Sequence, residues 1–333
     1  MYEMLGICLS LAGVLVLTSL ASALAVVLWR LSSRAAETWK ASTRAQFLFL
    51  LRIGPSLAAL LCVGGIFIPA YLANEPRHTG EIVTAKLGLV AAVSLYGIGC
   101  TLWRACATYI ATRRLVRDWM RHAEPVRIEE VAIPVFRLQH QFPLIAIVGV
   151  WRPKLFIADQ IFCSLNGEEI SAAIAHEEAH LGAWDNVKRG LLRACRNYLT
   201  AVPLGRCLDR AWFGAAELAA DEHAARSGPS VALDLASALV KVARLVPRGS
   251  SPVMLAGAAL IAQDSGNIRS RVLRLTHLAA HPNCLTRTGN HGPNLAIGAG
   301  LSGLLLAAVL MVSSPSFLAA IHAVMECVVS ALQ

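Results

Sequence analysis

The sequence predicts a mainly α-helical membrane protein, with four transmembrane helices and a cytoplasmic α+β domain inserted between the third and the fourth. Two observations predict this class. The 333 residues are 56% apolar and only 15% charged, whereas soluble domains average about half apolar and about a quarter charged. The apolar excess is gathered in blocks long enough to cross a bilayer, which takes about 20 helical residues.

The apolar blocks predict the membrane spans. They cover residues 4–29, 47–72, 82–110 and 295–312. The first block is not a typical signal peptide, because Glu3 is its only early charge and its apolar run is too long. We therefore expect a three-helix bundle over residues 1–112, a fourth span at 295–312, and a short external apolar tail or helix at 313–333.

Basic residues between the blocks predict the orientation. The loop at 30–46 carries four basic residues against one Glu, and two further clusters flank the middle region: Arg113, Arg114, Arg117 and Arg121, then Arg269, Arg271, Arg274 and Arg287. Cytoplasmic loops are enriched in Lys and Arg. We therefore expect a multi-pass protein of the inner (cytoplasmic) membrane, with the N-terminus outside and residues 113–294 in the cytoplasm. Topology and contact with anionic lipids explain the net charge of +9.

Residues 113–294 are predicted to form a small sheet followed by helices. Three stretches rich in Val and Ile, separated by prolines, indicate strands at 126–133, 144–150 and 154–157. A capping Asn166 followed by acidic residues indicates the first of four helices, and the others are expected at 186–201, 205–227 and 231–245. Residues 245–250 read LVPRGS, the thrombin site of expression tags, by coincidence or by engineering, and carry no functional inference.

The helix that follows Asn166 contains the motif H-E-x-x-H, from His176 to His180. Two histidines four positions apart lie on the same face of a helix, so both imidazoles can reach one metal ion. Glu177 follows the first histidine and is placed to take a proton from a metal-bound water. Because so short a motif also arises by chance, its meaning depends on a third ligand.

Glu217 fits the third ligand, since it lies on a separate predicted helix that can fold back. Asp221, one turn further on, is placed to accept the second ring N–H of a metal-bound histidine. A solvated helix face is the alternative for both residues, and pairing with the histidine motif favours the metal site. Asp185 either caps a helix or supports a ligand, with capping favoured. His223 is a weaker candidate for contacting an oxyanion.

These features together resemble the BlaR/MecR family of integral-membrane metallopeptidases, the signal transducers of beta-lactam resistance. The resemblance covers roughly residues 1–312, and four motifs carry it: VGVWRPKL at 148–155, HEEAH followed by Asp185-Asn186, ELAAD at 217–221 and IRSRV at 268–272. It implies a zincin-like (gluzincin) domain at 113–294. It further implies zinc held by His176, His180 and Glu217, with Glu177 as general base and acid.

The resemblance also implies proteolysis of a cytoplasmic protein, typically a DNA-binding transcriptional repressor, and self-cleavage within the same domain. The antibiotic-sensing members carry a penicillin-binding-like domain after the last membrane helix. That domain is not present in these 333 residues, so beta-lactam sensing is not expected.

Two alternatives stay open. One is a membrane-protein quality-control or processing protease resembling the HtpX or CAAX-protease group, and the other is a non-catalytic receptor or scaffold with a structural zinc site. The expected partners are the lipid bilayer, a cytoplasmic protein substrate and a second copy of the chain. No direct contact with nucleic acid is expected, because no recognition motif accompanies the basic residues.

Overall fold

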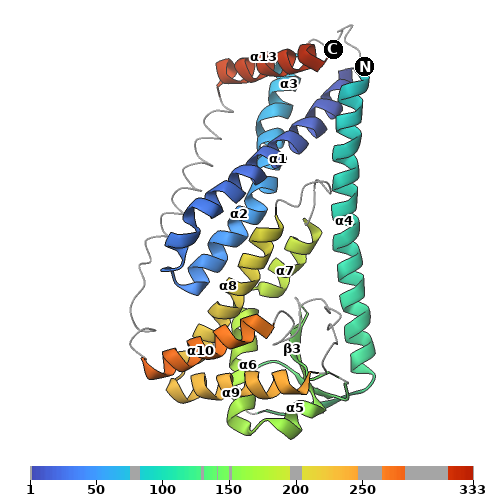
Figure 1. The fold of residues 1–333 in the computed structure, drawn as a ribbon. Helices are drawn as coiled ribbons and strands as arrows, with labels where there is room; N and C mark the ends of the chain where they lie inside the picture. Colours follow the sequence, from blue (N-terminus) through green and yellow to red (C-terminus); the bar gives the residue numbers. More distant parts are fainter. Residues whose placement is uncertain are drawn as a thin grey trace.

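The computed structural model describes residues 2–75, 83–128, 131–140, 142–149, 152–195, 205–246, 265–281 and 314–332. Most of these residues are helical. A bundle of long helices occupies one end of the molecule, and a smaller region of short helices and strands lies at the other (Figure 1).

Three helical rods form the bundle: α1 (Tyr2–Ala36), α2 (Ala41–Cys62) and α4 (Ala85–Met120). The second rod continues through a π-helical segment, Val63–Phe67, into α3 (Ile68–Asn74). Each rod is long and apolar enough to cross a membrane. Helices long and apolar enough to span a membrane are therefore found at three of the four predicted spans, and the fourth, at 295–312, lies outside the described residues.

The sheet contains four strands in the order β1-β2-β4-β3: β1 (Ala123–Val126), β2 (Val135–Leu138), β3 (Ile145–Val148) and β4 (Lys154–Ala158). The pair β2–β4 is parallel and the other two pairs are antiparallel. β3 is an edge strand. The expected strand at 126–133 is wrong, because β1 ends where it was to begin and β2 starts only after Pro134. The carbonyl of Pro134 accepts the N–H of Leu155 at 3.0 Å and so starts the β2–β4 ladder.

The helices that follow the sheet are α5 (Asp159–Ser164), α6 (Gly167–Gly182), α7 (Asp185–Ala194), α8 (Arg206–Ala225), α9 (Pro229–Leu245) and α10 (Ser265–Ala280). The predicted helices at 205–227 and 231–245 match α8 and α9 closely, whereas α7 ends at Ala194. A core of Phe156, Ile157, Leu235, Leu239 and Leu275 joins the sheet to α9 and α10. The last turn of α4 completes it, with the Trp119 and Phe156 ring centroids 5.1 Å apart.

Helix α8 joins the two regions. Trp212, in its first half, is fully buried in a cluster with Trp29 of α1 and Leu48 of α2. Glu217 and Asp221 lie further along the same helix, which also packs against α6, α9 and α10. The segment 313–333, expected as a tail or a helix, forms α13 (Pro315–Leu332), which lies across the far end of the bundle near both termini (Figure 1).

Candidate metal centre

Helix α6 presents the two histidines of the motif. Asn166 caps it as predicted, because its side chain accepts the N–H of Glu169 at 2.8 Å while the Glu169 carboxylate accepts the N–H of Asn166 at 3.0 Å. This capping box fixes the start of the helix. His176 and His180 lie one turn apart, with ring centroids 4.9 Å apart and ring planes at 90°. Both side chains are buried.

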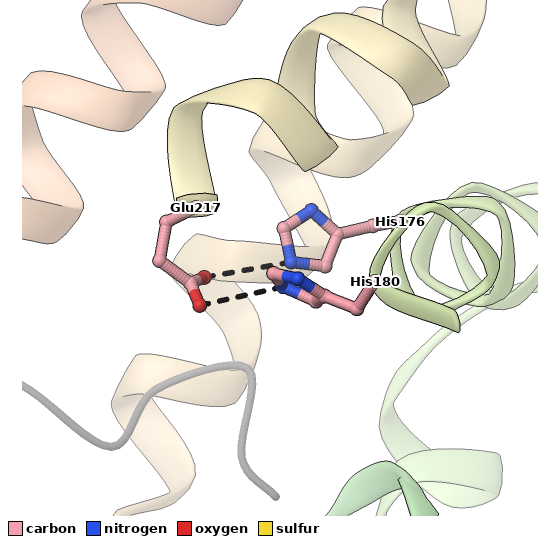
Figure 2. A group of neighbouring side chains, drawn as sticks. All are labelled: His176, His180 and Glu217. Carbon is pink, nitrogen blue, oxygen red and sulfur yellow. Dashed lines mark ion pairs between the residues drawn. The ribbon is translucent and has the colours of Figure 1, made fainter. Parts of the chain in front are cut away.

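Glu217 of α8 faces both imidazoles (Figure 2). Its Oε2 lies 3.5 Å from Nε2 of His176, and its Oε1 lies 3.4 Å from Nε2 of His180. One ligand atom from each of the three residues lies within 4.8 Å of the others, so the group is able to hold a metal ion. The structure thus brings together the three ligands that the sequence predicted.

A carboxylate lies against the second nitrogen of each imidazole. Oδ1 of Asp221 lies 3.0 Å from Nδ1 of His176, and Nδ1 of His180 donates to Asp185 at 2.7 Å. Such carboxylates orient a histidine ligand and fix its tautomer. Asp185 reaches His180 because Trp184, with φ of 58°, turns the chain sharply between α6 and α7. The preference for Asp185 as a helix cap is therefore wrong, since Trp184 occupies the N-cap position and Asp185 supports a histidine.

Arg271 of α10 is a site residue that the sequence analysis missed. Its Nη1 lies 3.0 Å from Oε2 of Glu217, and its Nε and Nη2 donate to both oxygens of Asp221 at 2.8 and 2.7 Å. Arg189 of α7 also donates to Oε1 of Glu217, at 3.1 Å. Arg271 was counted among the charges that set topology, but it is 3% exposed. Only its place in the IRSRV motif pointed to a local role.

These charges shift the pKa values of the site. Burial would lower the pKa of His180, but the charge of Glu217 and the hydrogen bond to Asp185 raise it to about 9. The pKa of His176 is also raised, because Asp221 and Glu217 outweigh its burial. Burial would raise the pKa of Glu217, but the charges of His180 and Arg271 hold it well below the usual range. Metal binding must therefore displace protons from the histidines.

The side chain of Glu177 extends from α6 toward the edge strand β3. Its Oε2 accepts the backbone N–H of Ile147 in β3 at 3.4 Å, and the carbonyl of the same Ile147 accepts a hydrogen bond from the side chain of Asn186 at 2.9 Å. Glu177 is 6% exposed. Glu177 is therefore not an ordinary solvated acid on a helix surface, because its carboxylate is buried beside a possible metal ligand and a strand edge. His223, the weaker candidate, is exposed.

The donor set fits a first-row divalent ion. Two imidazoles and one carboxylate are the ligands that hold zinc in many hydrolytic enzymes, where a fourth position stays open. Nε2 of His176 is fully buried and has no hydrogen-bond partner among the described residues. Nε2 instead lies 3.5 Å from the Glu217 carboxylate, an ion pair without a hydrogen bond, and a metal ion held between the two groups would satisfy both. The geometry therefore defines a candidate metal centre between α6 and α8.

No protein-family model matches the chain, and no curated protein is similar to it. The description of this candidate metal centre therefore rests on its geometry and chemistry alone.

Proposed function

We propose that the chain is a membrane-embedded zinc metallopeptidase that hydrolyses a peptide bond of a protein on the cytoplasmic side. The observation that carries this proposal is the metal-ready group of His176, His180 and Glu217, with the buried carboxylate of Glu177 next to the first histidine. A purely structural metal site has no use for such a carboxylate. This observation favours an enzyme over a scaffold.

Zinc at this group would lower the pKa of a bound water toward neutrality and polarise the scissile carbonyl. The chain supplies the rest. Glu177 takes the proton from the attacking water and returns it to the leaving amine. Asp185 accepts Nδ1–H of His180, and the Asp221 carboxylate lies 3.0 Å from Nδ1 of His176, so both acids favour the tautomer that presents Nε2. Arg271 balances the negative charge of Glu217 and Asp221, which keeps both carboxylates ionised.

The outer edge of β3 is the proposed docking place for the substrate. An extended peptide can add to a sheet edge through its backbone, and β3, whose four residues are all buried, is an edge strand beside α6. At Ile147, however, both backbone groups are already engaged, the N–H by Glu177 and the carbonyl by Asn186. Docking must displace these contacts. If substitutions along residues 144–150 leave cleavage unchanged, this docking mode is wrong.

The proposed topology has four spans. α10 lies with the sheet at one end of the bundle and α13 lies at the other end (Figure 1). The fourth span, at 295–312, lies outside the described residues and rests on the apolar composition of that block. The proposed orientation, with the metal centre in the cytoplasm, rests on the basic loop 30–46. A transcriptional repressor as substrate, and self-cleavage, rest on the family resemblance.

The proposal is tested by metal-dependent hydrolysis. The purified full-length protein in detergent is incubated with a mixed library of quenched fluorescent peptides, and its own fragments are followed by mass spectrometry. Hydrolysis should stop on chelation and return with added zinc. Hydrolysis that persists after the metal has been removed would contradict the proposal. Cleavage restricted to few sequences favours a defined substrate, whereas broad cleavage favours the quality-control alternative.

A further inference from the structure

We propose a second metal site, at the end of the bundle far from the first, formed by Glu75, His322 and Glu326. Glu75 directly follows α3, while His322 and Glu326 lie one turn apart on α13. Nε2 of His322 lies 3.5 Å from Oε2 of Glu75 and 3.3 Å from Oε1 of Glu326. One ligand atom of each residue lies within 4.8 Å of the others. The site takes a divalent transition-metal ion of the zinc class.

Apolar packing brings these residues together from distant parts of the chain. Ile321, next to His322, packs against the cluster of Leu5, Tyr71 and Leu87. This contact lays α13 across the end of α3 (Figure 1). The position of His322 beside Glu75 is thus fixed by the fold and does not depend on a flexible side chain finding a surface acid.

The electrostatics of the group favour a cation. A single ring nitrogen carries at most one proton, yet Nε2 of His322 faces two carboxylates at similar distances. The side chain of Glu75 is 5% exposed and that of His322 is 12% exposed, so the charges are poorly screened by water. A divalent ion between the three atoms would contact the ring nitrogen and both carboxylates at once.

The ligand atoms of this second site, one imidazole nitrogen and two carboxylate oxygens, also indicate which class of metal ion it prefers. Imidazole suits zinc and its first-row neighbours, whereas calcium and magnesium prefer oxygen ligands alone. Nε2 is the ligand atom, because it is the ring nitrogen of His322 that faces both carboxylates. The side chain of Glu326 is 59% exposed, which leaves room for a water as a further ligand. The bound ion fixes α13 to α3.

This inference uses none of the residues of the proposed active site, so the two are tested separately. The first centre is removed by changing His176 and His180 to Gln in the full-length protein. The metal-free variant is equilibrated with zinc, excess zinc is removed by gel filtration, and bound zinc is measured by mass spectrometry. A single zinc ion per chain should remain. It should disappear when His322→Gln is added and survive excess magnesium or calcium.

Two control variants separate the site from other metal-binding side chains. Cys327→Ser, next to Glu326, and His277→Gln, on α10, should each leave the retained zinc unchanged. His322→Gln in the otherwise natural protein provides a second measurement if the double variant does not fold, and it should remove a single zinc ion. Equal zinc contents with and without His322→Gln, or displacement by magnesium, would overturn the proposal. That result would leave His322 as a side chain that only contacts Glu75 and Glu326.

Discussion

Each histidine of the candidate metal centre is held between two carboxylates. Glu217 faces both Nε2 atoms, while Asp221 and Asp185 each lie against one Nδ1 atom. This arrangement orients both rings before any ion binds, and Arg271 prevents repulsion between Glu217 and Asp221. The chemistry proposed here depends on these individual contacts.

Asp221→Asn tests the support of His176. The amide keeps the shape of the side chain but removes the charge that holds the Nδ1 proton. We expect affinity for zinc to fall by about 10- to 100-fold, measured by competition with a chromophoric chelator. Asp234→Asn on α9, a half-buried acid away from the centre, is the matched control and should bind zinc normally. Equal affinities in the two variants would refute a supporting role for Asp221.

The raised pKa of His180 predicts a pH dependence of the metal-free protein. Its folded pKa of about 9 exceeds the ordinary value of 6.5, so protonated His180 stabilises the fold fully below about pH 6.5. That stabilisation is lost as the pH rises through about 9. We expect the melting temperature to fall over this range, and to fall less in His180→Gln. Zinc affinity should rise over the same range, because fewer protons are displaced. Identical pH profiles of the two proteins would contradict the prediction.

At the level of the elements, most helices and the ligand set were predictable from the sequence, whereas α5, α10, parts of the sheet and the arginine contacts were not. Apolar periodicity and the capping Asn166 located α6, and i,i+4 spacing placed His176 and His180 on one face. The strand β2 is not evident from the sequence, because a proline can end a strand or precede one, and Pro134 precedes β2. The contacts of Arg271 with Glu217 and Asp221 were not predictable, because α10 meets α8 only through tertiary packing, which no local sequence pattern encodes.

The contact between α2 and α8 predicts a large effect of a single substitution. Nε of Arg52 donates to Asp209 at 2.9 Å, and its Nη2 donates to the carbonyl of Cys195 at 2.8 Å. The side chains of Arg52 and Asp209 are 9% and 11% exposed. Arg52→Met breaks this buried pair by removing its positive charge, which costs about 3–5 kcal/mol. We expect a clearly lower thermal midpoint, measured by the unfolding of purified protein.

The double variant Arg52→Met, Asp209→Asn serves as the control for this pair. It removes both charges, so it should recover part of the lost stability. A single Arg52→Met substitution with no effect would show that the pair contributes nothing to holding α8 against the bundle.

At the scale of the whole molecule, three apolar rods place the metal centre and α13 at opposite ends of the bundle. The proposed orientation therefore predicts opposite accessibilities for two exposed cysteines, Cys163 on α5 and Cys327 on α13. In intact cells, a membrane-impermeant maleimide should label a variant that retains only Cys327. A variant that retains only Cys163 should be labelled only after lysis. The reverse pattern would place the metal centre outside the cell.

The most direct test of a metallopeptidase compares Glu177→Gln with Glu178→Gln. The two residues are neighbours on α6, but only Glu177 is buried beside Ile147. Zinc content and peptide hydrolysis are measured on the same purified samples. We predict that Glu177→Gln keeps its zinc and loses hydrolysis and self-cleavage, while Glu178→Gln keeps both. Undiminished hydrolysis by Glu177→Gln would contradict the proposed mechanism.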